Sequence, residues 1–253
     1  MKFEHELFHG TLIKRHKRFL ADVKLDDGEI VTAHCPNSGS MLTLKDEGNE
    51  VWLSPATNPK AKLDYKWEIV KIDDVMVGIN TSLPNKLVER AILDGTISEL
   101  QEYDNLRREM KYGKNSRIDL FLSEHHEGKP DCYVEVKSVT LSRENGIGQF
   151  PDSVTSRGTK HLGELSDMVD LGHRSVMIYL AQRSDLKAFE VASDIDPDYA
   201  QKLGEYVNQG AWDSASGMIS DELLDKFAFS GNADGLIRQG NALFEEGANR
   251  IEY

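Results

Sequence analysis

The pattern of short and long segments changes near residue 80, and this change limits the folds open to the chain. Residues 1–80 contain short β-branched and aromatic stretches, separated by turn residues such as those at 26–28 and 36–39. Short strands at this close spacing predict a small β-barrel. The expected strands cover residues 7–13, 19–23, 30–34, 50–53 and 67–72.

Beyond residue 80 the apolar pattern alternates between helical and strand spacing. Apolar residues from Leu87 to Ile92 recur as on one face of a helix, which predicts a helix over residues 84–93. The nearly continuous apolar stretch 175–180 suits a strand that is buried on both faces. The expected order is helix, three strands, loop, helix, strand and further helices. These elements cover residues 84–93, 106–112, 117–122, 132–139, 140–154, 155–169, 175–180, 198–208, 221–229 and 233–246.

Composition narrows the classes of protein. The chain has 253 residues, enough for two modest domains, and only two cysteines, too few for a disulfide framework or a cysteine zinc site. Its formal net charge of −13 argues against coating nucleic acid through bulk charge, so binding would need local basic patches. No long apolar run or signal-like start is present, which predicts a cytoplasmic protein without membrane contact.

Three charged side chains are expected to converge where two of the central strands pair. Asp119 lies in the expected strand 117–122, and Glu135 and Lys137 lie in the expected strand 132–139. Alternate residues of a strand share one face, so Glu135 and Lys137 point to the same side. Carboxylates suit Mg²⁺ or Mn²⁺, and Mg²⁺ usually takes one or two of them together with water and substrate phosphate. We therefore predict that Asp119 and Glu135 hold the metal, while Lys137 assists an attacking water or neutralises phosphoryl charge.

A simpler explanation exists for the same strand. Glu135 and Lys137 alternate with apolar residues, so they could form only the solvent-facing side of an amphipathic strand. The preceding and following helices, together with the sequence Arg117-Ile118-Asp119, favour the metal site.

Basic residues cluster at two places. Five occur in a row at residues 14–18 beside Phe19, which on a strand could track a phosphate backbone while the ring stacks on a base. Such a run also suits a solvated edge strand. The second group lies at the start of the helix 155–169, where a helix N-terminus suits a phosphate, or forms only a solvated face. The expected nucleic-acid contacts are Lys14, Arg15, Lys17, Arg18, Asn37, Arg157, Lys160 and His161.

The order of elements around Asp119, Glu135 and Lys137 resembles the PD-(D/E)XK nuclease core, which has an αβββαβ order and a D…E-x-K triad. Glu89 matches the helical acid that many members use as an accessory catalytic group, although a surface role fits it as well. More of the chain, about residues 10–210, resembles the sugar fermentation stimulation protein family. The segments that carry this resemblance are residues 14–23, 34–41, 111–113, 116–119, 132–141 and 150–162.

This resemblance implies an α/β (α+β) protein with three parts: an OB-like barrel at 1–80, a nuclease-like αβββαβ domain at 81–210, and an atypical helical tail at 211–253. It also implies DNA binding with little sequence preference and a link to the regulation of maltose metabolism. Family members continue after the position of Gly210 with a strand that extends the sheet, whereas this chain departs from that pattern. The missing strand would leave an exposed sheet edge, which bears on stability and on the formation of a homodimer.

Two functions fit these residues. The first is a nucleic-acid-binding protein, with DNA as the expected partner, that hydrolyses phosphodiesters with Mg²⁺ or Mn²⁺. The second is a non-catalytic, sequence-nonspecific DNA-binding regulator of sugar metabolism that uses a nuclease-like fold. Both predict binding that weakens steeply with salt. They differ in whether Glu135 and Lys137 support cleavage.

Overall fold

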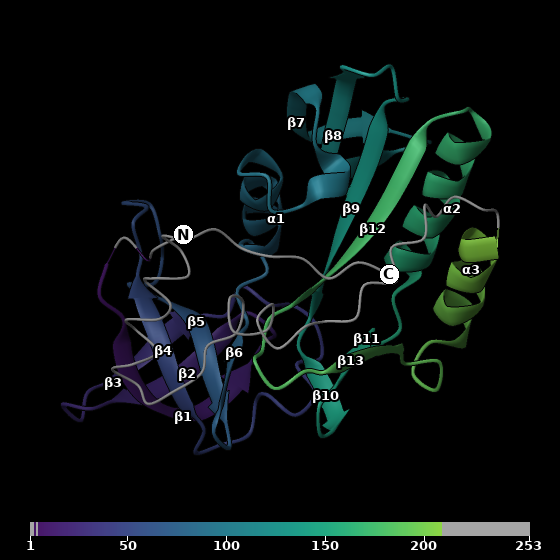
Figure 1. Cartoon of the computed structure of the whole chain (residues 1–253). Helices are drawn as coiled ribbons and strands as arrows, with labels where there is room; N and C mark the ends of the chain where they lie inside the picture. The colour runs from purple at the N-terminus through teal and green to yellow at the C-terminus, as the bar shows by residue number, and fades with distance from the viewer. Residues whose placement is uncertain (1–2, 4, 209–253) are drawn as a thin grey trace.

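The computed structural model describes residues 3 and 5–208. Six strands in the first part of the chain form one sheet in the order β3-β2-β1-β4-β5-β6, and an additional pairing of β3 with β5 closes it into a barrel (Figure 1). The expected barrel is confirmed. Its strands are β1 (Phe8–His16), β2 (Leu20–Leu25), β3 (Ile30–His34), β4 (Glu50–Pro55), β5 (Tyr65–Ile72) and β6 (Val75–Gly78).

Alternation of side chains builds the barrel core. Along β2, the inward residues Ala21, Val23 and Leu25 are buried while their neighbours are not. They pack with other apolar side chains around Trp67, which is fully buried. Strand β6 was not expected from the sequence, because it is only four residues long and follows β5 after a two-residue turn.

The second part of the chain is a mixed α/β unit. Its central sheet has the order β12-β9-β8-β7, in which β9 and β12 are parallel and the other neighbours antiparallel. Helix α1 covers one face, and α2 and α3 cover the other (Figure 1). The expected order of helix, three strands, helix and strand is therefore confirmed for the central sheet and the helices that cover it. The bounds are α1 (Pro84–Leu93), η1 (Ser98–Leu100), β7 (Tyr103–Tyr112), β8 (Ser116–His125), β9 (Cys132–Val139), α2 (Ser156–Asp170), β12 (Arg174–Ala181) and α3 (Pro197–Asn208).

The prediction of a loop at 140–154 is wrong for most of its length. Strands β10 (Leu141–Glu144) and β11 (Ile147–Phe150) form a hairpin, and β13 (Ala188–Val191) adds to β11 in parallel. The parallel partners are about forty residues apart in sequence, so no local pattern reports the pairing. This small sheet extends the structure beside the barrel (Figure 1).

The two parts of the chain contact each other through the loop that follows β3 and through the end of β6. The Ser40 hydroxyl donates to the Asp152 backbone oxygen at 2.7 Å, and the Met41 backbone N–H donates to the Asp152 carboxylate at 3.0 Å. A third contact joins the Gly78 N–H to the Gln182 backbone oxygen at 2.8 Å. This junction fixes the loop of residues 36–41 against the second part of the chain.

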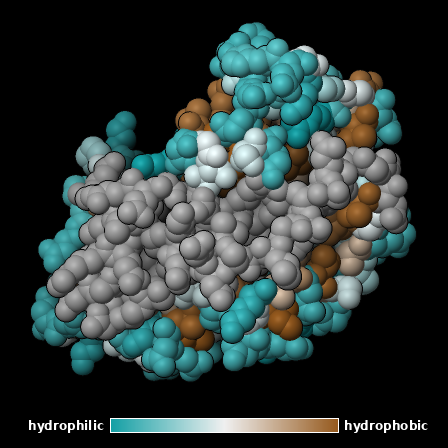
Figure 2. Space-filling view, viewed as in Figure 1, coloured by the Kyte–Doolittle hydropathy of each residue, from teal (hydrophilic) through white to brown (hydrophobic). Residues whose placement is uncertain are grey.

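On the face shown in Figure 2, hydrophilic residues cover most of the described surface, and hydrophobic residues form small separate patches. Within residues 3 and 5–208, no helix is both long and apolar enough to cross a membrane. The helices expected at 221–229 and 233–246, and the tail at 211–253 as a whole, lie outside the described residues.

Candidate nuclease-like site

Asp119 lies where strands β8 and β9 separate. Their pairing runs from Leu122 opposite Cys132 to Leu120 opposite Val134 and ends before Asp119. One Asp119 oxygen, Oδ2, then accepts the Val136 backbone N–H at 2.8 Å, and the other, Oδ1, accepts the Asn85 side-chain N–H at 2.7 Å. The carboxylate is thus held between β9 and α1.

Glu135 is the second acid of the site and lies on β9. Strand alternation turns its side chain toward α2, where its Oε1 accepts His161 Nδ1–H at 2.5 Å and Lys137 Nζ–H at 2.7 Å. The residue is only 2% exposed. Among the described residues, nothing donates a hydrogen bond to its other oxygen, Oε2, although that atom is buried.

A buried carboxylate oxygen without a partner is energetically unfavourable, so this atom meets a requirement for a cation ligand. Asp119 supplies a second carboxylate, close enough for the charge of Glu135 to act on it. Mg²⁺ is commonly bound by one or two carboxylates with water and substrate phosphate as its other ligands, and the two acids fit that pattern. No group of three or more His, Cys, Asp or Glu side chains within residues 3 and 5–208 is arranged to hold a metal ion. Two carboxylates leave the remaining ligand positions of such an ion to water and substrate phosphate.

The two acids differ in their electrostatics. Burial, and then the negative charge of Glu135, raises the pKa of Asp119 to about 6. Burial also acts to raise the pKa of Glu135, but the hydrogen bond from His161 and the charge of Lys137 outweigh it and lower that pKa below its usual value. Both carboxylates are therefore ionised at neutral pH, as metal binding requires.

His161 was expected to contact phosphate, but the structure places it behind Glu135. Its ring is 3% exposed, and its Nε2 accepts a hydrogen bond from Arg157 Nε at 3.4 Å. These contacts place the proton of a neutral imidazole on Nδ1, where it is donated to Glu135. His161 thus orients the acid instead of facing solvent.

The neighbouring cations differ from His161 in exposure. Lys160 has a side chain that is 49% exposed, and its Nζ donates to the Ser116 hydroxyl at 3.0 Å. Arg157 is also at the surface of α2. Both remain able to meet a phosphate near the start of the helix, and their predicted role remains a prediction.

Helix α1 contributes a residue that was not expected. Asn85 touches Asp119, whereas Glu89, one turn later, is paired with Arg108 on β7 through an Nε–Oε1 contact of 2.7 Å. Glu89 is thus placed on the same side of the helix as Asn85, with its carboxylate engaged by an arginine. The helical spacing from Glu89 to Asn85 is the signal that could have identified the asparagine.

Two more buried groups without hydrogen-bond partners lie close to the acids. The Tyr112 hydroxyl and the Glu164 Oε2 atom are both buried and have no partner in the described part of the chain. Burial, with the charges of Glu135, Glu164 and Asp119, raises the pKa of Tyr112 far above its usual value. Glu164 was detectable in principle, because it follows Arg157 and His161 at helical spacing on one face of α2.

The basic run at 14–18 does not form one continuous strand as expected. Strand β1 ends at His16, and Lys17 and Arg18 lie in the turn with positive φ angles of 48° and 63°. Both side chains are exposed there. Lys14 remains on β1, with its Nζ 3.6 Å from the Asp22 carboxylate. Lys14, Lys17 and Arg18 are thus the exposed cations of the run, and of these only Lys14 lies near an acid in the described part of the chain.

Arg15 and Asn37 belong to the junction loop. Arg15 Nη2 donates to the backbone oxygens of Arg18, Asn37 and Gly39 at 3.0, 2.9 and 2.9 Å. Asn37 is 8% exposed, and its side-chain oxygen accepts the Gly39 N–H at 2.8 Å. Both residues shape the loop that contacts Asp152, and Arg15 Nη2 is used within it, while the phosphate contacts expected of the two residues remain predictions.

Replacing Arg15 with methionine is expected to lower the free energy of unfolding by about 2 kcal/mol, because three backbone carbonyls, two of them in partly buried contacts, lose a charged donor. Urea unfolding would measure this change. The matched variant Arg18→Met removes an exposed turn cation and should change stability by less than about 0.5 kcal/mol. Equal stabilities of the two variants would contradict the structural role of Arg15.

The chain matches two protein-family models. The model described as the SfsA N-terminal OB domain covers residues 13–79, and that of the sugar fermentation stimulation protein RE domain covers residues 82–215. The chain is 54% identical over 210 residues to a sugar fermentation stimulation protein homolog of Paramagnetospirillum magneticum, covering 83% of this chain and 88% of that protein. A Rhodospirillum rubrum homolog is 52% identical over 218 residues, with coverages of 83% and 89%.

A solved structure is also similar. The structure of Pyrococcus furiosus SfsA in complex with Ca²⁺ superposes with a TM-score of 0.75 and is 25% identical, covering 83% of this chain and 87% of that chain. Its agreement over both parts of the chain supports the same fold as the family models. The chain therefore belongs to the sugar fermentation stimulation protein family, with an OB-type barrel followed by a restriction-endonuclease-like domain.

Proposed function

We propose that this protein binds DNA and hydrolyses phosphodiester bonds with Mg²⁺ or Mn²⁺. The observation that carries this proposal is the buried Glu135 carboxylate, whose Oε2 has no hydrogen-bond partner among the described residues and which lies next to Lys137. An oxygen of this kind has no evident use in folding, but it is a suitable ligand for a cation. The similarity to Pyrococcus furiosus SfsA, solved in complex with Ca²⁺, adds support for a divalent ion.

Asp119 and Glu135 would hold the metal. A divalent cation, when bound, supplies Lewis-acid stabilisation of the charge that develops on a phosphoryl oxygen. Asn85 and the Val136 backbone N–H fix the orientation of Asp119, and His161 fixes that of Glu135. Such supporting hydrogen bonds hold ligands in place and typically change metal affinity or activity 10- to 100-fold when they are lost, as a rough guide.

Lys137 is the group best suited to act on the reacting phosphate. Its Nζ lies 2.7 Å from Glu135 Oε1, and the side chain is 13% exposed. An ammonium group in a partly dry site can stabilise negative charge on the phosphate and orient an attacking water by donating hydrogen bonds. The mostly buried stem of Lys137 limits the positions of its charged end, so little reorganisation is needed on substrate binding.

The DNA backbone would be held by cations at separate places. Lys17 and Arg18 project from the barrel turn, and Lys160 and Arg157 lie at the start of α2. These groups provide local positive charge on a chain whose formal net charge is −13. Binding through a few such contacts would be sensitive to salt and would read no base sequence.

One observation favours the alternative of a DNA-binding regulator without catalysis. Glu135 Oε1 already accepts hydrogen bonds from both His161 and Lys137, so one of its two oxygens is engaged by the protein. A fold of this kind could bind DNA by the same cations and leave phosphodiesters intact. The two functions therefore differ in whether cleavage occurs and depends on Lys137, and they share the same DNA-binding surface.

The Lys137→Met variant separates these functions. In Mn²⁺, the wild-type protein should cut labelled single- or double-stranded DNA or RNA, and EDTA should stop the reaction. Loss of the ammonium is expected to slow cleavage by roughly 10²-fold, while Mn²⁺ still binds to the two carboxylates. Cleavage rates and calorimetric Mn²⁺ titrations would measure both effects.

The exposed Lys129→Met variant is the matched control, and thermal unfolding checks that both proteins fold. Lys129 lies between β8 and β9, away from the acids in sequence and exposed. If no substrate is cut by the wild-type protein, or if Lys137→Met cuts at the wild-type rate, the catalytic proposal is wrong and the regulator remains.

A further inference from the structure

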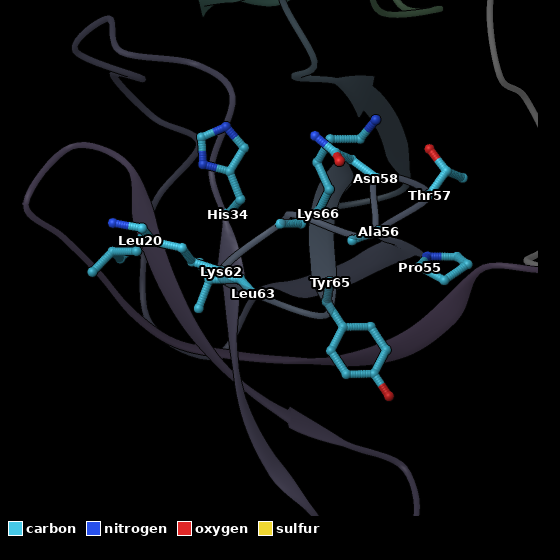
Figure 3. Close-up of a pocket in the computed structure, with 11 residues that line it drawn as sticks. Leu20, His34, Pro55, Ala56, Thr57, Asn58, Lys62, Leu63, Tyr65 and Lys66 are labelled. Carbon is cyan, nitrogen blue, oxygen red and sulfur yellow. The ribbon is translucent and has the colours of Figure 1, made fainter.

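The barrel contains a pocket that the proposed catalytic site does not use. It has a volume of about 610 Å³, within the range of pockets that bind small organic groups. It lies between the end of β3, the loop from β4 to β5, and the start of β5 (Figure 3). Six residues matter for its chemistry: Leu20, His34, Lys62, Leu63, Tyr65 and Lys66.

Barrel closure creates this pocket. Strand β3 pairs with β2 so that His34 lies opposite Leu20, and the same strand pairs with β5 so that His34 lies opposite Lys66. Leu20 and Lys66, which are far from His34 in the sequence, are thereby brought to one edge of the barrel. The pocket therefore depends on the closed fold rather than on a local motif.

The lining combines apolar, aromatic and cationic groups. Leu20 and Leu63 offer apolar surface and the His34 imidazole is exposed at the edge, while the Tyr65 ring points away from His34 (Figure 3). Tyr65 is held in place by an edge-to-face contact with Phe8 at 5.2 Å between ring centroids. This combination suits a flat, aromatic and partly polar group better than it suits an aliphatic chain.

The charges around the pocket are positive. Lys62 is exposed, and Lys66 has a 37% exposed side chain although its Nζ also contacts the buried Glu68 at 2.9 Å. The exposed Lys17 and Arg18 immediately precede Phe19 and Leu20 along the chain. No Asp or Glu is among the described residues that line the pocket. An anionic ligand is therefore favoured here despite the acidic composition of the chain.

We infer that this pocket receives an unstacked base of single-stranded nucleic acid, while neighbouring phosphates contact Lys62, Lys17 and Arg18. The inference rests on the proposed nucleic-acid binding and names the form of nucleic acid that is preferred. A single strand can turn one base into the pocket freely, whereas a duplex must first unpair and unstack it at a cost of a few kcal/mol. Stacking of a base on an aromatic ring contributes about 1–3 kcal/mol, and the exposed His34 provides such a ring.

Binding of labelled oligonucleotides in EDTA tests the pocket without cleavage. Fluorescence anisotropy would compare a short single strand, the same sugar–phosphate chain with abasic sites, and the matched duplex. The intact single strand is expected to bind roughly tenfold more tightly than either of the others. His34→Ala should remove most of this difference while leaving binding of the abasic strand unchanged.

His126→Ala is the control, because His126 is an exposed histidine on the second part of the chain and not on the barrel. Unchanged thermal unfolding of His34→Ala would show that the exposed position does not support the fold.

Equal binding of the intact and abasic strands, or wild-type preference in His34→Ala, overturns the base pocket and leaves DNA binding in place. Tight binding of a free mononucleotide, as strong as that of the strand, also overturns it. If none of the oligonucleotides binds, the proposed function itself fails.

Discussion

Replacing Glu135 with glutamine is expected to slow Mn²⁺-dependent cleavage by roughly 10³-fold and to weaken Mn²⁺ binding at least about tenfold. Glutamine keeps the size of the side chain but removes the negative charge from the buried position beside Asp119. The oxygen that has no hydrogen-bond partner, Oε2, is then replaced by a neutral amide atom that ligates a divalent cation poorly. Single-turnover cleavage and calorimetric titration with Mn²⁺ would measure the two losses.

The exposed acid Glu124 on β8 provides a matched control. Glu124→Gln makes the same chemical change to net charge and should leave cleavage and Mn²⁺ binding at the wild-type level. The comparison with Lys137→Met is also informative, because that variant is expected to lose cleavage but keep the metal. If Glu135→Gln binds Mn²⁺ as tightly as the wild-type protein, the metal site is not at this carboxylate.

Metal affinity is expected to fall about tenfold when the pH is lowered from about 7 to about 5, because Asp119 has a pKa of about 6. Below that value the carboxyl group is protonated and a cation must displace the proton. The pKa of Glu135 is lowered, so Glu135 stays ionised over the same range. Titration with Mn²⁺ at several pH values would measure the effect, and Asp119→Asn should abolish the dependence together with most of the affinity.

The same pKa shift affects stability in a definite direction. The folded protein holds a proton on Asp119 more tightly than the unfolded chain does, because the folded pKa is raised from 3.8 to about 6. This contribution to the free energy of unfolding is present below about pH 4 and is lost as the pH rises through about 6, amounting to about 2–3 kcal/mol. The loss reflects the penalty of ionising a buried acid next to Glu135.

Urea unfolding of the metal-free protein would measure this slope. Asp119→Asn should show a smaller decline in stability between about pH 4 and pH 6 than the wild-type protein, since asparagine does not titrate. Added Mn²⁺ should offset the decline in the wild-type protein by binding only the folded form. A wild-type stability that rises through this range at the same rate as that of Asp119→Asn would show that Asp119 is not perturbed by burial.

These results together would distinguish a nuclease from a binding protein with the same fold. Loss of cleavage with retained metal in Lys137→Met, and loss of both in Glu135→Gln, would support catalysis at the acids. DNA binding in all of these variants would place the binding surface elsewhere, at the barrel turn and the start of α2. A protein that binds DNA and metal but never cleaves would instead fit the regulator.

Several features of the fold and the site were determined by local sequence. Strand β9 has the expected bounds, because Cys132, Val134 and Val136 alternate with Tyr133, Glu135 and Lys137 over most of its length. Helix α1 also has the expected bounds, since Pro84 suits the first turn and its apolar residues repeat at helical spacing. The same alternation placed Glu135 and Lys137 on one face, where their side chains meet at 2.7 Å.

The tertiary structure alone decided which groups surround that pair. His161 contacts Glu135 because α2 packs across the sheet, and Asn85 contacts Asp119 because α1 covers the opposite face. Arg15 was read as a DNA contact from its position in a basic run, but the closed barrel brings the carbonyls of Asn37 and Gly39 to its guanidinium. Strand periodicity specifies which face a residue occupies, whereas the identity of its partner depends on contacts between segments that are far apart in the chain.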